Sequence, residues 1–282
     1  MLHNFQQAWR FTFQSWRMAL FVHVLLLMTV LPIGMQLYHV LGASIGHSLS
    51  LEKLLLDYNH TVFMDMINVH GASISPLLGQ LRWVLPMYLL VAVLVHAGLM
   101  YMVVMQEGSW KIFWKGVAYY FFSFLKIALV FITILVISLV IIWMPFIVYI
   151  VNINEWLVDE TGLVWLFYGT VIVSFCWFII LFIWSVLTRS IKIKGPEHSI
   201  FKSIKSGWKS LRQNFFSYLG QYILISLPFL LFWTFYYYLN AISGMVSSTL
   251  VWVFIILQQL YIFFRVCLRI ALFHGITFLE EK

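Results

Sequence analysis

Polar and apolar residues are arranged along this chain in long blocks rather than in alternation. Six stretches of 22 to 25 residues are almost continuously apolar, and a membrane-spanning helix needs about 20 such residues. The strands of a transmembrane barrel would instead alternate over about 10 residues. The sequence therefore predicts an all-α polytopic protein with six transmembrane helices, at residues 18–41, 83–105, 127–151, 163–187, 218–239 and 249–273.

The composition fits the same class of protein. The 282 residues are 63% hydrophobic and 10% charged, whereas an average soluble domain is about 45–50% apolar and about 25% charged. So little charge cannot cover the surface of a water-soluble globule. The two cysteines, Cys176 and Cys267, fall inside predicted spans and indicate neither a disulfide framework nor a redox pair.

Basic residues are concentrated on alternate sides of the predicted spans. Fifteen of the 17 Lys and Arg lie on the side of the two termini, and only Lys53 and Arg82 lie on the other side. Because cytoplasmic loops are enriched in Lys and Arg, both termini are expected in the cytoplasm. This orientation gives an extracytoplasmic loop at 42–82 and a basic cytoplasmic loop at 188–217. Contacts with anionic lipids account for the net charge of +7 without nucleic-acid binding.

Similar segments precede the odd-numbered spans. The nine residues from Ala8 and the nine from Gly207 both read small–Trp–basic–x–x–x–Gln–polar–aromatic, and residues 111–124 are basic and aromatic without the Gln. We infer three repeats, each with an amphipathic interfacial segment, an outgoing helix and a returning helix; chance similarity in an aromatic-rich chain is the alternative. Each outgoing helix is expected to kink or end at a proline, namely Pro32, Pro145 and Pro228.

The clearest amphipathic segment lies in the basic loop. It predicts a helix that begins near Ser199 and enters the fifth span near Phe216, either at an anionic membrane surface or packed on the protein's own bundle. Its apolar stripe is Ile200, Phe201, Ile204, Trp208 and Leu211, and its basic residues are Lys202, Lys205, Lys209 and Arg212.

The extracytoplasmic loop has a second amphipathic pattern. Residues 50–67 predict a helix that lies on the outer membrane surface or caps the bundle. The loop also contains potential metal ligands, but no two of its histidines have the i, i+4 spacing of a zinc-binding helix. A solvated polar face is therefore preferred to a metal site. The potential ligands are His47, Asp57, His60, Asp65 and His70.

Polar residues within the spans are the candidates for a functional site, because polar groups in a membrane are costly. They would suit a proton relay or an anion site. The alternative is that the arginines snorkel, the glutamines bond neighbouring helices and the histidine lies near an interface. No Asp or Glu lies deep in a span, which argues against a carboxylate-type proton-coupled transporter. The candidate residues are His96, Gln258, Gln259, Arg265 and Arg269.

Motifs of known enzymes are absent from the sequence. It has no HExxH, no GxSxG, no P-loop and no GxGxxG. We therefore expect a protein that is not an enzyme and that has no catalytic residues, cofactor or bound metal.

Two parts of the chain resemble known proteins. These are residues 203–224 (SIKSGWKSLRQNFFSYLGQYIL), and HAGLMYMVV at 96–104 followed by KGVAYYFFSFLKI at 115–127. They resemble a diffuse group of bacterial six-helix integral membrane proteins of unknown function, which is similar to the membrane domain attached to some glycerophosphoryl diester phosphodiesterases. The resemblance implies a bacterial inner-membrane protein. It implies no catalytic residues, because this chain has no phosphodiesterase domain.

Three functional hypotheses follow from the sequence. The first is a non-enzymatic subunit or accessory scaffold of a larger envelope complex, with anionic lipids and another membrane protein as partners. The second is a transporter or lipid-moving protein that uses the kinked odd-numbered helices around a central path, because many transporters build their sites at helices broken by prolines. The third, more distant, is an intramembrane enzyme that uses His96 and the span arginines.

Overall fold

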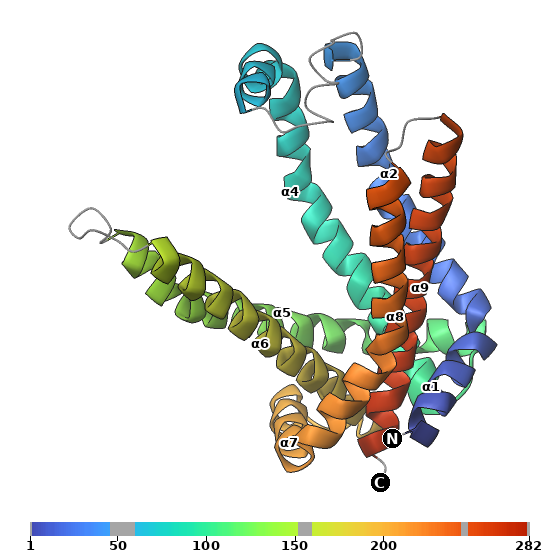
Figure 1. Ribbon diagram of the computed structural model, residues 1–282. Helices are drawn as coiled ribbons and strands as arrows, with labels where there is room; N and C mark the ends of the chain where they lie inside the picture. Colours follow the sequence, from blue (N-terminus) through green and yellow to red (C-terminus); the bar gives the residue numbers. More distant parts are fainter. Residues whose placement is uncertain (1, 46–59, 152–159, 244–247, 281–282) are drawn as a thin grey trace. The chain divides into compact units, whose positions relative to one another are not determined.

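The protein is an all-α polytopic membrane protein. The structure, a computed structural model, describes residues 2–45, 60–151, 160–243 and 248–280. Six of its helices are long and apolar enough to cross a membrane, which confirms the predicted number. The helices of the described residues (Figure 1) are α1 (Leu2–Gln14), α2 (Trp16–Ile45), α4 (His60–Met105), α5 (Trp110–Val151), α6 (Glu160–Lys194), α7 (Ile200–Gln213), α8 (Phe215–Ser243) and α9 (Ser248–Glu280).

The chain divides into two compact units. The first unit comprises residues 1–19 and 93–282, and therefore contains α1, the end of α4 and all of α5 to α9. The second comprises residues 20–92, which include most of α2 and most of α4. Most of the buried apolar side chains belong to the first unit. In the second unit, Thr29 bonds the carbonyl of Leu25 within α2, at 2.9 Å, and so satisfies its hydroxyl inside its own helix.

Two helices extend beyond the boundaries that apolarity predicted. Residues 60–82 belong to α4, so this part of the expected loop is helical and continuous with the second span. The second of these helices is α6, the fourth span, which continues to Lys194. Arg189 and Lys192 therefore belong to this helix and not to the expected basic loop. The apolar run marks the part of a helix that suits the bilayer, and the helix need not end there. Residues 46–59, which include His47 and Asp57, lie outside the described residues.

The three prolines lie inside helices rather than at their ends. The outgoing helices α2, α5 and α8 continue without a break through Pro32, Pro145 and Pro228. Helix ends at these prolines are therefore excluded, and kinks there stay a prediction. A proline removes one hydrogen bond of its helix, and the continuous apolar surroundings on both sides favour continued helix.

The first and third repeat segments fold alike. Ser15 alone separates α1 from α2, and Asn214 alone separates α7 from α8, so both breaks fall at the same position of the sequence repeat. The backbone bonds also match: Ser15 N–H donates to Phe11 O at 3.0 Å, and Asn214 N–H donates to Ser210 O at 3.2 Å. The middle segment differs, because α5 continues without a break from Trp110.

Each repeat segment packs through a buried small residue on a different returning helix. Ala8 is fully buried in α1, which packs on α9. Gly116 of α5 lies so close to α4 that a Cβ would stand 2.9 Å from the carbonyl oxygen of Ala97. Likewise, a Cβ on Gly207 of α7 would stand 2.8 Å from Oγ1 of Thr188 in α6. Small residues permit such close helix approach.

The ends of the three returning helices meet around Phe273 of α9. Its ring is fully buried, and its centroid lies 5.4 Å from that of His96 in α4 and 6.4 Å from that of Phe182 in α6. This meeting point places the core of the first unit at the end where the repeat segments also pack.

Candidate functional site

Most buried polar side chains of the first unit lie at one end of it. We call this the basic end: α1, the last turns of α4, the first turns of α5, α7, the beginning of α8 and the last turns of α6 and α9. Buried polar groups normally have hydrogen-bond partners, so their partners show what this end can do. The buried polar residues here include Thr12, Thr188, Arg189, Ser190, Lys192, Ser203, Gln221, His274 and Thr277.

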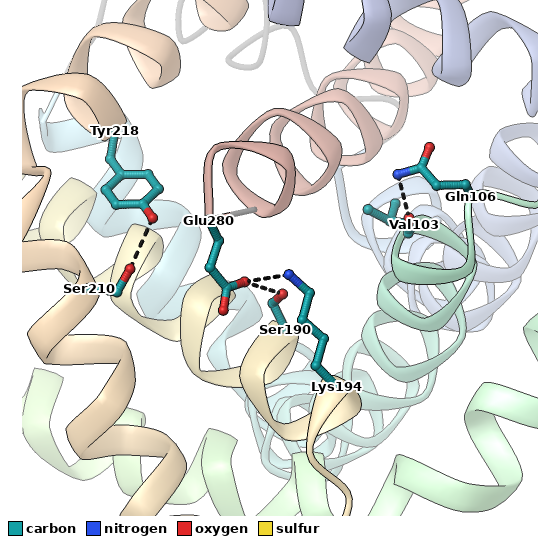
Figure 2. A network of polar contacts seen from close by, with 7 residues as sticks. All are labelled: Val103, Gln106, Ser190, Lys194, Ser210, Tyr218 and Glu280. Atoms are coloured by element: carbon teal, nitrogen blue, oxygen red, sulfur yellow. Dashed lines mark hydrogen bonds and ion pairs between the residues drawn. The ribbon is translucent and has the colours of Figure 1, made fainter. Parts of the chain in front are cut away.

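Glu280 connects the end of α9 to α6. Its carboxylate accepts a hydrogen bond of 2.7 Å from Ser190 Oγ and forms a 3.1 Å ion pair with Lys194 Nζ. Figure 2 shows that both donors approach the same carboxylate oxygen. A partly exposed ion pair of this kind contributes about 0–1 kcal/mol. The contact therefore joins two helix ends but contributes little to the free energy of unfolding.

Lys192 closes the turn between α6 and α7. Its buried ammonium donates to the carbonyls of Pro196 at 2.7 Å and His198 at 2.6 Å. A cation at the end of a helix also interacts favourably with the helix dipole. Lys192 was counted as a residue of the basic loop, but it belongs to α6 and its ammonium is bonded within the turn that follows.

His274 holds the end of α4. Its Nε2 lies 3.0 Å from Oε1 of Gln106, and its ring stacks on Phe11 of α1 at 5.0 Å. Gln106 has the left-handed backbone conformation, with φ of 55°, and its Nε2 donates to Val103 O at 3.0 Å (Figure 2). A non-glycine residue in this conformation is uncommon. The side-chain bonds of Gln106 hold the helix end there, a contact that the sequence pattern did not reveal.

The span residues predicted to form a polar site have unlike surroundings. Gln258 is exposed and donates to Tyr236 Oη at 3.0 Å, the helix–helix bond that the alternative predicted. Gln259 and His96 are half-buried, and Arg265 is exposed. From Gln258 to Arg269, α9 advances about 16 Å, so these residues are spread along the helix.

Arg269 does lie near another arginine. Its charge is close enough to repel that of Arg189, which is 9% exposed in α6. The guanidinium carbon of Arg189 stands 5.7 Å from the centre of the Phe124 ring. The buried Nε of Arg189 has no hydrogen-bond partner among the described residues.

The positions of these two arginines match in the repeat. Trp208 of α7 contacts Trp184 of α6 at 4.8 Å, and Trp9 of α1 contacts Phe264 of α9 at 5.3 Å. Each arginine follows the contacted aromatic residue of its helix by five positions. Sequence analysis missed Arg189 because it follows the apolar run. Its repeat match to Arg269 was the signal that could have revealed it.

The helix predicted in the basic loop is present as α7. Ser199 caps its start by accepting a bond of 3.2 Å from Lys202 N–H, and α8 begins at Phe215, close to the predicted position. A 3.0 Å hydrogen bond between Ser210 and Tyr218 crosses the break that follows (Figure 2).

The packing face of α7 differs from the predicted apolar stripe. Ser203, Gly207 and Leu211 are buried, because small residues let α7 approach α6 closely. Phe201 is 78% exposed. One face of α7 therefore packs on the bundle while another is exposed. The basic residues Lys202, Lys205, Lys209 and Arg212 are all exposed.

No metal site is found in the described part of the chain. No three His, Cys, Asp or Glu side chains there are placed to hold a metal ion. Comparison with known proteins adds no identification: no protein-family model, curated protein or solved structure matches this chain. The resemblance to bacterial six-helix proteins therefore stays a prediction.

Proposed function

We propose that this chain is a non-enzymatic subunit or accessory scaffold of a larger complex in a bacterial cytoplasmic membrane. The observation that carries the proposal is the bare outer part of its helix pairs. In the first unit, α5 runs beside α6 and α8 beside α9 (Figure 1). Beyond Phe131 in α5 and Ile225 in α8, no described residue of these two helices is buried. Each pair thus presents apolar surface well away from the packed basic end.

This surface is bulky as well as apolar. Trp165 of α6 is 76% exposed and Trp252 of α9 is 68% exposed. Lipid tails tolerate such faces, and association between membrane helices depends on close van der Waals packing rather than on a hydrophobic driving force. Two helix pairs with large exposed side chains provide the surface that another membrane protein can pack against.

The transporter hypothesis has less support. It drew on helices interrupted at prolines, and α2, α5 and α8 continue unbroken through theirs. The hypothesis of an intramembrane enzyme depended on His96, whose ring packs on the buried ring of Phe273. We therefore retain the subunit as the proposed function.

Anionic lipids are the second proposed partner. Basic and aromatic residues are exposed together where the repeat segments meet the spans, and Arg17 lies 5.8 Å over the ring of Trp16. Aromatic rings and basic side chains together suit the headgroup region of a membrane. The exposed side chains of α7 also combine an aromatic ring, Phe201, with basic groups such as Lys202 and Lys205.

Photo-crosslinking in the native membrane tests the subunit proposal. A photoreactive residue at Ile141, Phe175, Leu231 or Ile256 stands on an exposed face of a helix pair. We expect at least one of these positions to form a discrete adduct with one membrane protein. The control position is Phe201 on α7, where we expect lipid adducts. Lipid adducts alone at all four pair positions would contradict the proposal.

The proposed orientation has a separate test. Reporter fusions after Asn59 and within residues 154–161 are expected to report the extracytoplasmic side. Fusions at Lys205 and at the C-terminus are expected to report the cytoplasm, because the basic residues lie on that side. A fusion at Lys205 that reports the extracytoplasmic side would contradict the whole orientation.

A further inference from the structure

Arg189 is buried without an anionic partner among the described residues. Its side chain is 9% exposed, and its Nε has no acceptor there. An arginine cannot lose its charge easily, and a buried charge is costly unless it is paired. The ring of Phe124 on one side gives some compensation, since a cation over an aromatic face is attracted to it. It does not supply the oxygen acceptors that a guanidinium needs.

The surrounding charges make the need for an anion greater. Arg269 of α9 adds a second positive charge that repels the first. The carboxylate of Glu280 is engaged by Ser190 and Lys194. Lys192 is also cationic, and its ammonium is directed to the carbonyls of the following turn. This part of the basic end therefore concentrates positive charge.

From this arrangement we propose that Arg189 binds a phosphate group between α6 and α9. The planar guanidinium presents parallel N–H donors that match two phosphate oxygens. Arg189 lies five residues before the end of α6 at Lys194. If that end lies just outside the bilayer, Arg189 lies at the depth of the lipid headgroups. Basic pockets between membrane helices bind lipid headgroups in this way.

The phosphate could come from two sources. One is the headgroup of an anionic phospholipid, whose acyl chains would lie along the apolar faces of the spans. The other is free phosphate from the aqueous side. Both provide the same oxygens to the guanidinium of Arg189, so the experiment must compare them directly.

The experiment uses the full chain, purified in a non-ionic detergent and exchanged free of lipid. Phosphatidylglycerol, diacylglycerol without a phosphate, and inorganic phosphate are added separately. Native mass spectrometry counts bound lipid, and thermal unfolding measures stabilisation. We expect one tightly bound phosphatidylglycerol, no comparable binding of diacylglycerol, and at least about tenfold weaker binding in Arg189→Gln. Stabilisation by inorganic phosphate alone would identify free phosphate as the source.

Two controls separate this site from general attraction of charges. Arg265→Gln removes an exposed arginine from α9, and the triple variant K202Q/K205Q/K209Q removes exposed charges from α7. Both are expected to keep the tightly bound lipid. Equal loss in these controls and in Arg189→Gln would overturn the proposal in favour of non-specific attraction.

Stability without any probe gives an independent readout. Removing an unpaired buried charge relieves its desolvation and its repulsion, so probe-free Arg189→Gln is expected to unfold at the same temperature as the native chain or above it. A second variant, Arg189→Lys, keeps the charge but loses the fork of donors, and it is expected to bind more weakly while remaining folded. Unchanged binding in both variants, or loss of the fold in Arg189→Gln, would overturn the proposal.

Discussion

Gly116→Val is expected to destabilise the first unit strongly, whereas Gly169→Val is expected to have little effect. A Cβ at Gly116 would stand 2.9 Å from the carbonyl oxygen of Ala97 and would also overlap Tyr101, so α4 and α5 would have to separate. Overpacking costs about 1–3 kcal/mol, and a backbone contact leaves no flexible side chain to move aside. We expect a loss of about 3 kcal/mol in the free energy of unfolding.

The control is closely matched, because Gly169 also lies inside a long apolar helix. A Cβ at Gly169 would meet nothing within 4 Å, so the variant changes helix propensity without a clash. Unfolding of both variants in detergent, followed by tryptophan fluorescence, measures the difference. Equal stability of the two variants would show that α4 and α5 do not pack through Gly116. Gly207→Val is expected to act like Gly116→Val, since its Cβ would meet Thr188.

The sequence was a good guide to the spans and to the repeat segments. Long apolar blocks located all six spans because a helix must be apolar where it crosses lipid. The structure breaks the helices at Ser15 and Asn214, and in the repeat both positions hold the polar residue that follows the Gln. The middle segment lacks the Gln, and α5 is unbroken there. The two segments that share the full sequence pattern thus share a helix break, and the segment that lacks the Gln has none.

Packing faces were predicted less well, and the reason is physical. In a soluble helix the apolar stripe is the buried face, but beside a membrane an apolar residue can equally face lipid. On α7, Phe201 is exposed and Ser203 is buried, the opposite of what an apolar stripe predicts for a soluble helix. The same argument applies to Gly116, whose burial depends on the backbone of α4. A one-dimensional pattern does not reveal which helix approaches closely enough to require a small residue.

The candidate site was predicted only in part. Arg269 was recognised because it lies in an apolar run, whereas Arg189 follows one and was counted as a loop charge. Its burial comes from α6 extending to Lys194 and packing against α7 and α9. Arg189 and Arg269 lie 80 residues apart in the sequence. Only the repeat, aligned through its aromatic contacts, connects them.

Trp184→Ala is expected to detach α7 from α6. The indole Nε1 of Trp184 donates to the carbonyl of Ile204 at 3.0 Å, and its ring contacts Trp208 at 4.8 Å and Phe131 at 5.0 Å. The substitution removes the bond and both ring contacts together. A large-to-small change of this kind costs about 3–5 kcal/mol in a packed core, and we expect the lower end because Trp184 is half-buried.

The matched variants assign this loss to its causes. Trp165→Ala removes a largely exposed indole from the same helix and is expected to leave stability nearly unchanged. Trp184→Phe keeps a ring but loses the donor, so it should cost about 1 kcal/mol. Proteolysis at Lys205 and Lys209 reports directly on α7, because a detached helix exposes its backbone to trypsin. If Trp184→Ala lowered stability without faster cleavage at these lysines, the indole would stabilise α6 against α5 through Phe131 rather than hold α7.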